Sequence, residues 1–338
     1  MKKSKSIGLW VILLLIFLLC FSVKAQQLSN ELSNCLKELK IKRGDPRLFV
    51  LTNAAYVRIG EVDSWELMSI IEKETGTSYG KKNLLFYHSE EKVPLNVVFF
   101  IKDKGEGLIL SYDGKNFKKQ LFNFNDNESL KELVKTRKDA FTIISILDAW
   151  ANDAPHDLLK CAEFHNHLCP GLLSGYFIAK FIQEYYPLQE GQRYIYVSCP
   201  PWCKDDAIQV LLDLTPGKRR LYVRDLSDEE KGALQDSGVV GVFILWDESK
   251  KEGKGVIPSF NWDVAYQRCG IDRKALAGEE AVFGRMRLNR CLLKKDFKKE
   301  DLVKVLKEVE VNEALLKELL RGGNPYKLLD LLTSKGGL

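Results

Sequence analysis

The sequence predicts an α+β protein made of two related sheet-and-helix units followed by a helical C-terminal tail. At 338 residues the chain exceeds the usual size of a single domain, so we expect one large or two modest domains. A second observation is that one order of elements occurs twice along the chain. This order is a strand, a helix, a turn containing threonine and Gly-Lys, and another strand.

The two copies can be read from apolar runs and turn residues. The first copy comprises Arg47–Leu51, Trp65–Ile71 and Thr75–Phe86, with further strands at Asn96–Ile101 and Gly107–Ser111. The second copy comprises Arg193–Val197, a helix from Asp206, Thr215–Val223, and a later strand at Val239–Trp246. This repetition predicts a degenerate internal duplication.

These patterns divide the chain into four parts. Residues 1–25 form a leader, 26–150 the first half, 151–293 the second half and 294–338 the tail. The tail is expected to be helical because its Lys/Glu-rich faces accompany a leucine stripe at Leu315, Leu316, Leu319 and Leu320.

The leader predicts export. Lys2, Lys3 and Lys5 precede an apolar run from Ile7 to Val23, and small residues at Val23 and Ala25 fit a cleavage site after Ala25. The run is also long enough to act as an uncleaved membrane anchor, since a bilayer span needs about 17–25 residues. Both interpretations place residues 26–338 outside the cytoplasm, either secreted or anchored to the membrane.

Composition argues against some classes of function. The net charge of +5 is mild and no aromatic-rich basic cluster accompanies it, so nucleic-acid binding is not expected. Export permits disulfides, and Cys269 with Cys291 is a candidate bridge, although spacing alone does not fix the pairing.

The stretch around Cys169 has the composition of a metal site. His165, His167 and Cys169 alternate, and Pro170 opens an apolar run at helical spacing. Because proline favours the first helical position, we expect Cys169 at the N-cap, where the helix dipole lowers the pKa of a thiol. A soft thiolate with nearby imidazoles suits zinc or another borderline metal.

A second cysteine lies at a similar place. Cys203 precedes the expected helix from Asp206, so two helix starts could bring two thiolates to one metal ion. We assign Cys169, Cys203 and His167 as metal ligands. His165 is either a fourth ligand or a proton-transfer group with a catalytic role. Three protein ligands are typical of catalytic or transport sites and four of structural sites.

These residues also suggest a family. Phe164–Leu172 reads Phe-His-Asn-His-Leu-Cys-Pro-Gly-Leu and resembles the F-H-G-H-x-C-P-G-L signature of the FmdE family, which takes its name from a component of formylmethanofuran dehydrogenase. Cys203–Leu211 and Thr215–Lys218 resemble that family's C-x-x-D-A-I-Q-V-L segment and its T-x-G-K. Asn166 stands where the family usually has glycine, and the family's T-G-C-T is reduced to Asp213–Thr215. The resemblance covers residues 155–225 and implies a metal-associated α+β domain.

The first copy is similar to the same family at Thr75–Leu84, with Thr77 in place of the family's cysteine. It has no His-x-His-x-Cys motif. The first half is therefore expected to be a scaffold, and the metal ligands to belong to the second. A duplicated chain could be a monomer that imitates a dimer, or it could form a homodimer.

Three functions remain open from the sequence. The first is an exported zinc protein with a catalytic centre or an accessory role to a membrane-associated oxidoreductase. The second is a noncatalytic carrier of a metal or metal cofactor. The third is an extracytoplasmic thiol-disulfide protein that uses Cys199 and Cys203, which are spaced as C-x-x-x-C.

Overall fold

The computed structural model describes residues 23–278, 280–294 and 297–332. The chain divides into two compact units, Met1–Leu147 and Asp148–Leu338. The predicted leader, with its cleavage or anchoring segment, lies almost entirely outside the described residues. Among the residues that are described, no helix is both long enough and apolar enough to cross a bilayer.

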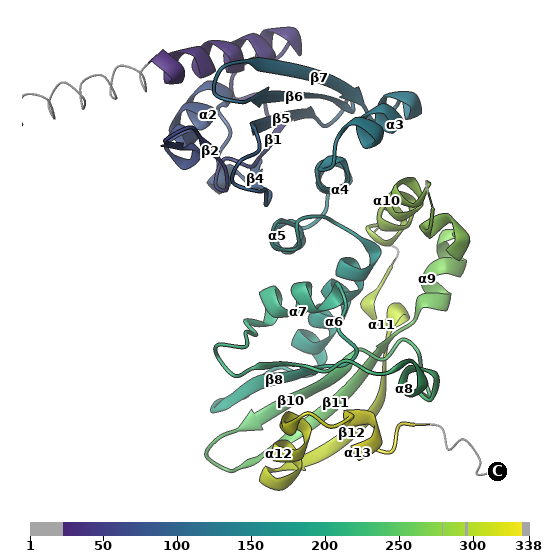
Figure 1. The fold of residues 1–338 in the computed structure, drawn as a ribbon. Coiled ribbons are helices and arrows are strands. Elements are labelled where there is room, and N and C mark those ends of the chain that lie inside the picture. The colour runs from purple at the N-terminus through teal and green to yellow at the C-terminus, as the bar shows by residue number, and fades with distance from the viewer. Residues whose placement is uncertain (1–22, 279, 295–296, 333–338) are drawn as a thin grey trace, which may run out of the picture. The chain divides into compact units, whose positions relative to one another are not determined.

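Unit 1 contains a five-stranded sheet in the order β4-β1-β5-β6-β7 (Figure 1). Strand β1 pairs parallel with β4, which follows it through α2, and the other pairs are antiparallel. A helix over residues 23–38 precedes the sheet. The other elements are β1 (Leu48–Thr52), β2 (Arg58–Ile59), β3 (Val62–Asp63), η1 (Ser64–Leu67), α2 (Met68–Thr75), η2 (Tyr79–Lys81), β4 (Leu84–Phe86), β5 (Leu95–Ile101), β6 (Glu106–Tyr112), β7 (Phe117–Asn123), α3 (Asn127–Thr136) and the first part of α4 (Ala140–Ala151).

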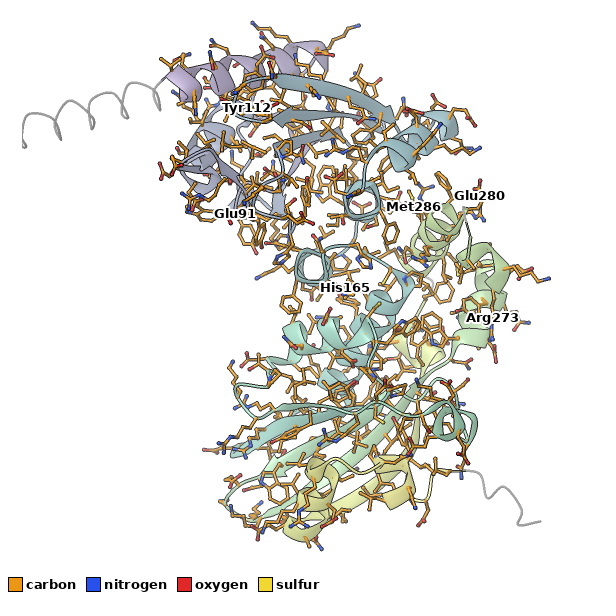
Figure 2. The ribbon with its side chains drawn as sticks, in the orientation of Figure 1. Glu91, Tyr112, His165, Arg273, Glu280 and Met286 are labelled. Atoms are coloured by element: carbon orange, nitrogen blue, oxygen red, sulfur yellow. A yellow bond between two sulfur atoms is a disulfide. The ribbon has the colours of Figure 1, made fainter. Side chains whose placement is uncertain are left out.

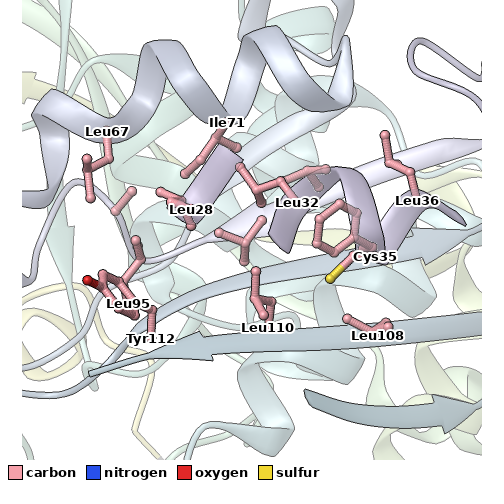
Figure 3. Packing of buried hydrophobic residues seen from close by; sticks show 14 of the residues in the cluster. Leu28, Leu32, Cys35, Leu36, Leu67, Ile71, Leu95, Leu108, Leu110 and Tyr112 are labelled. Carbon is pink, nitrogen blue, oxygen red and sulfur yellow. The ribbon is translucent and has the colours of Figure 1, made fainter. Parts of the chain in front are cut away.

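The core of unit 1 lies between its sheet and two helices. Figure 3 shows Leu28, Leu32 and Cys35 of the first helix packing with Ile71 of α2 above the strands. These residues recur at helical spacing, so the helix turns one apolar face to the sheet.

Unit 2 has a sheet in the order β9-β8-β10-β11-β12. Within it, α6 and α7 lie on one face, and α12 and α13 on the other (Figure 1). Its elements are α5 (His156–His165), α6 (Pro170–Tyr185), β8 (Gln192–Ser198), α7 (Lys204–Leu212), β9 (Leu221–Val223), α8 (Asp228–Gly232), β10 (Gly241–Asp247), β11 (Glu252–Phe260), α9 (Trp262–Cys269), η3 (Arg273–Leu276), α10 (Ala281–Leu292), α11 (Lys299–Leu302), β12 (Val303–Asn312), α12 (Glu313–Arg321) and α13 (Pro325–Leu328).

The two sheets have the same topology. Strand β8 pairs parallel with β9 through α7, as β1 pairs with β4 through α2, and all remaining neighbours are antiparallel. Helices α2 and α7 also end at equivalent left-handed residues, Gly76 and Asp213. The predicted α+β architecture of two related units is therefore confirmed.

The C-terminal part combines helices with an unpredicted strand. Helices α12 and α13 confirm its helical character, and Leu316 and Leu319 are buried in the core of unit 2. The prediction of helix is wrong for Val303–Asn312, which form β12 against β11. This stretch alternates valine with lysine and glutamate, so period-two burial against a neighbouring strand decides its structure.

One disulfide joins α9 to α10. Cys269 and Cys291 are bonded, with Cα atoms 5.8 Å apart, which confirms the candidate bridge. The other described cysteines, Cys35, Cys161, Cys169, Cys199 and Cys203, are free.

Candidate metal centre

The first site segment is a sharp reversal between α5 and α6. Helix α5 ends at His165, and Asn166 follows with φ of 64° in the left-handed region. Glycine is favoured there, and asparagine is one of the few other residues that adopt this conformation readily. Asn166 can therefore replace the glycine of the resembled motif without changing the path of the backbone.

Cys169 caps the start of α6, as the sequence predicts. Pro170 occupies the first turn, and the Cys169 Sγ accepts a hydrogen bond from the Leu172 backbone N–H at 3.4 Å. The position satisfies one of the backbone donors that a helix leaves unpaired at its N-terminus.

Cys203 lies at the start of α7, also as predicted. The loop before it is fixed by a buried ion pair, because Lys204 Nζ lies 2.7 Å from Asp205 Oδ1 and donates to the Pro200 carbonyl at 2.9 Å. Asp205 in turn accepts hydrogen bonds from the Trp202 backbone N–H and the Tyr196 hydroxyl, both at 2.8 Å.

Glycines let α6 and α7 approach closely. A Cβ at Gly175 would lie 2.0 Å from the Lys204 carbonyl oxygen, and one at Gly171 would lie 3.0 Å from the Cys203 Cβ. Without side chains at these positions, the two helix starts come together with their cysteines on the same side.

His165, Cys169 and Cys203 form the group that could hold a metal ion. One ligand atom from each lies within 4.8 Å of the other two. The His165 Nε2 is 3.7 Å from the Cys169 Sγ. Tetrahedral zinc with usual bond lengths would place a sulfur and a nitrogen about 3.5 Å apart, so the arrangement fits zinc with little adjustment.

The other ring nitrogen of His165 is fixed by a carboxylate. His165 Nδ1 lies 2.6 Å from Asp206 Oδ2, and Figure 2 labels His165 near the end of α5. Metal-binding histidines commonly donate their second N–H to a carboxylate, which sets the tautomer and orients the ring. The sequence could not separate this role of Asp206 from simple helix capping.

His167 lies beside the group rather than in it. Its ring centroid is 4.2 Å from that of His165, and it is not among the three residues with converging ligand atoms. The geometry therefore brings His165 to the cysteines, whereas the sequence assigned His167 as the ligand and His165 as a fourth ligand or proton-transfer group.

The segment that contains these residues is similar to a known protein family. The sequence model of the family FmdE, described as "Molybdenum formylmethanofuran dehydrogenase operon", matches residues 164–275. This part of the chain is similar to the FmdE family. No curated protein matches the chain. The FmdE match begins just before His165 and includes Cys169, Cys203 and Asp206, and it leaves unit 1 and α10 outside.

The pKa values of the two cysteines in the matched segment differ strongly. A hydrogen bond from Cys169 is the main reason why the pKa of Cys203 falls to about 5, with His165 adding to the effect against the opposing effect of burial. The hydrogen bond to Cys203, together with burial, holds the pKa of Cys169 far above its usual range. The prediction that the pKa of Cys169 is lowered is therefore wrong. Cys203 is the thiolate of the pair, because it accepts the hydrogen bonds from Cys169 and His165.

The pKa values of His165 and His167 also differ strongly. Burial disfavours the charged form of His165, but hydrogen bonds to Asp206 and Cys203 outweigh it and raise its pKa to about 9. Burial and the charges of His165 and Arg285 lower the pKa of His167 to about 4. His165 thus forms an imidazolium–thiolate pair with Cys203, and His167 stays neutral near pH 7.

Helix α10 supports the site from outside the matched segment. The buried Asn289 amide donates to the Leu168 carbonyl at 3.0 Å, between His167 and Cys169. Arg285 of the same helix lowers the pKa of His167 through its charge. No spacing rule connects these residues to a motif more than 100 residues earlier, so sequence reasoning missed them.

Cys199 does not join the site. Its side chain is fully buried within the hydrophobic core of unit 2, and burial raises its pKa to about 12. Thiol-disulfide exchange requires an accessible thiolate. The structure therefore gives no support to a redox pair of Cys199 and Cys203.

Proposed function

We propose that this chain is an exported metal-binding protein whose FmdE domain holds a zinc ion through His165, Cys169 and Cys203. The observation that supports this most directly is the convergence of their three ligand atoms, with Asp206 orienting the histidine. Two sulfurs and one imidazole suit zinc better than hard cations, which prefer oxygen ligands.

Three protein ligands leave room for a fourth, exchangeable ligand. Bound zinc would supply Lewis acidity and lower the pKa of a coordinated water to about 7. His167, whose ring centroid lies 4.2 Å from that of His165, would remain neutral beside the ligand histidine near pH 7. Asp206 would hold His165 in the tautomer that presents Nε2 to the metal.

The test is the metal content of the full protein purified without added metal. We expect about one zinc per chain, and loss of stoichiometric zinc in Cys169→Ser and in Cys203→Ser. Cys161→Ser is the matched control, because Cys161 is a buried free thiol of α5 outside the cluster. Stoichiometric metal that survives both site substitutions would contradict the proposal.

A carrier role for the same centre is the second candidate, favoured by the partly accessible position of Cys203. Export and the described operon of the FmdE family fit delivery of a metal to a membrane-associated oxidoreductase. A carrier would release zinc to a chelator within minutes, whereas a catalytic centre would retain it. Exchange kinetics therefore separate these two roles.

A further inference from the structure

A cavity of about 290 Å³ lies next to the metal centre in unit 2. Pro200–Trp202, which follow β8, and Asp225, which follows β9, contribute to its lining. Strands β8 and β9 are the parallel pair of this sheet. The cavity therefore lies beside the carboxyl ends of this parallel pair.

Aromatic rings form one wall of the cavity. Trp202, Phe260 and Trp262 all line it. The Trp262 centroid is 4.6 Å from that of Phe260 and 5.5 Å from that of Trp202. Trp202 is 53% exposed, so core packing does not account for it. Exposed tryptophan at a cavity mouth offers a large apolar face to a flat ligand.

The charged groups of the lining are already compensated. Among the lining residues, the buried Lys204 pairs with Asp205 at 2.7 Å. Lys231 Nζ lies 3.4 Å from Asp225 Oδ1. A charged ligand would lose hydration without gaining an unpaired counter-charge. An uncharged ligand avoids this cost.

The cavity also lies close to Cys203. This residue stands between two lining residues, Trp202 and Lys204. A Cβ built at Gly171 would lie 3.5 Å from the Cys203 Sγ and 3.6 Å from an atom of the Trp202 ring. The Cys203 thiol and the Trp202 ring therefore both lie close to Gly171 of α6.

We propose that this cavity binds a small, uncharged, planar aromatic molecule beside the metal ligand Cys203. The volume of the cavity is just below the usual range for ligand sites, so it suits a molecule of one or two fused rings. The inference concerns a different set of side chains from the metal ligands, and it holds whether or not zinc is bound.

The experiment is an NMR titration of the full protein with four matched probes. Benzamide is neutral and planar, benzoate and benzylamine have the same ring with opposite charges, and cyclohexanecarboxamide has the amide without the flat ring. We expect benzamide to bind about tenfold more tightly than the other three. Trp202→Ala and Trp262→Ala should each weaken it about three- to tenfold, the loss expected for one aromatic contact.

Two controls make the result specific. Trp65→Ala removes a similarly exposed tryptophan from unit 1 and should leave benzamide binding within about twofold. Cys169→Ser should lose zinc and keep benzamide binding, which separates this inference from the proposed metal function. The inference is overturned if benzamide does not saturate, if a charged or nonplanar probe binds more tightly, or if the two pocket tryptophans have no effect.

Discussion

At the scale of single residues, the site depends on one contact that fixes a histidine. Asp206 holds His165 Nδ1 at 2.6 Å, which leaves Nε2 facing the Cys169 sulfur. This carboxylate contact orients the His165 ring toward the cysteines.

We predict that Asp206→Asn weakens zinc binding about 10- to 100-fold, the usual effect of losing a carboxylate behind a metal-bound histidine. Competition with a chromophoric chelator measures it. Asp228→Asn, on the exposed first turn of α8, is the control and should leave the affinity for zinc unchanged. Unchanged affinity in Asp206→Asn would show that His165 is not a ligand.

Proton release should accompany zinc binding. Cys203, with a pKa of about 5, is already a thiolate at pH 7, whereas His165, with a pKa of about 9, and Cys169 still hold protons. Because metal ligands must be deprotonated, we expect about two protons to be released per zinc bound at pH 7. For the same reason, the affinity for zinc should rise with pH until His165 and Cys169 have lost their protons. Calorimetry in buffers of different ionisation enthalpy counts the protons; a value near zero or three would contradict these assignments.

At the scale of elements, the site is a junction of helix ends. Helices α6 and α7 each start at a cysteine, and Gly175 permits their contact at the Lys204 carbonyl. The Lys204–Asp205 pair fixes the loop before α7, and Asn289 of α10 fixes the loop before α6. Metal affinity should therefore depend on helix packing as well as on the ligands.

Gly175→Ala tests this dependence. Its Cβ would lie 2.0 Å from the Lys204 carbonyl oxygen, so α6 and α7 must separate, at a cost of about 1–3 kcal/mol or more in unfolding free energy. We expect lower stability in denaturant and weaker zinc binding together. Gly232→Ala, whose Cβ would meet nothing within 4 Å, should preserve both. A stable Gly175→Ala protein with normal zinc affinity would show that the spacing is not critical.

At the scale of the whole molecule, the chain consists of two units with one topology and different chemistry. Each unit has its own hydrophobic cluster. At the start of α2, unit 1 has Leu67 where unit 2 has Cys203 at the start of α7. The metal-ligand group found among the described residues lies wholly in unit 2.

We therefore predict that residues 148–338 produced alone fold and bind about one zinc. The reason is that both the ligands and a separate core belong to this unit. Dispersed NMR spectra and elemental analysis provide the measurement, with residues 26–147 as a control that should bind no stoichiometric zinc. A folded second unit without zinc, alongside a full chain that binds it, would show that unit 1 contributes to the site.

The sequence by itself determined the features that local chemistry controls. Pro170 after Cys169 predicts the cap of α6, and the repeated order of strands and helices predicts two related sheets. Local pattern was insufficient at β12, where valines alternating with charged residues also permitted a helix. Its counterpart in unit 1, β7, was not predicted either.

Only the tertiary structure decided which side chains meet. His165 and Asp206 are 41 residues apart, and Leu168 and Asn289 are 121 apart. Their contacts depend on how α5, α6, α7 and α10 pack, and no periodicity in the chain encodes those distances. The acidity of the two cysteines was decided in the same way, because it follows from their contact with each other and with His165 rather than from either helix alone.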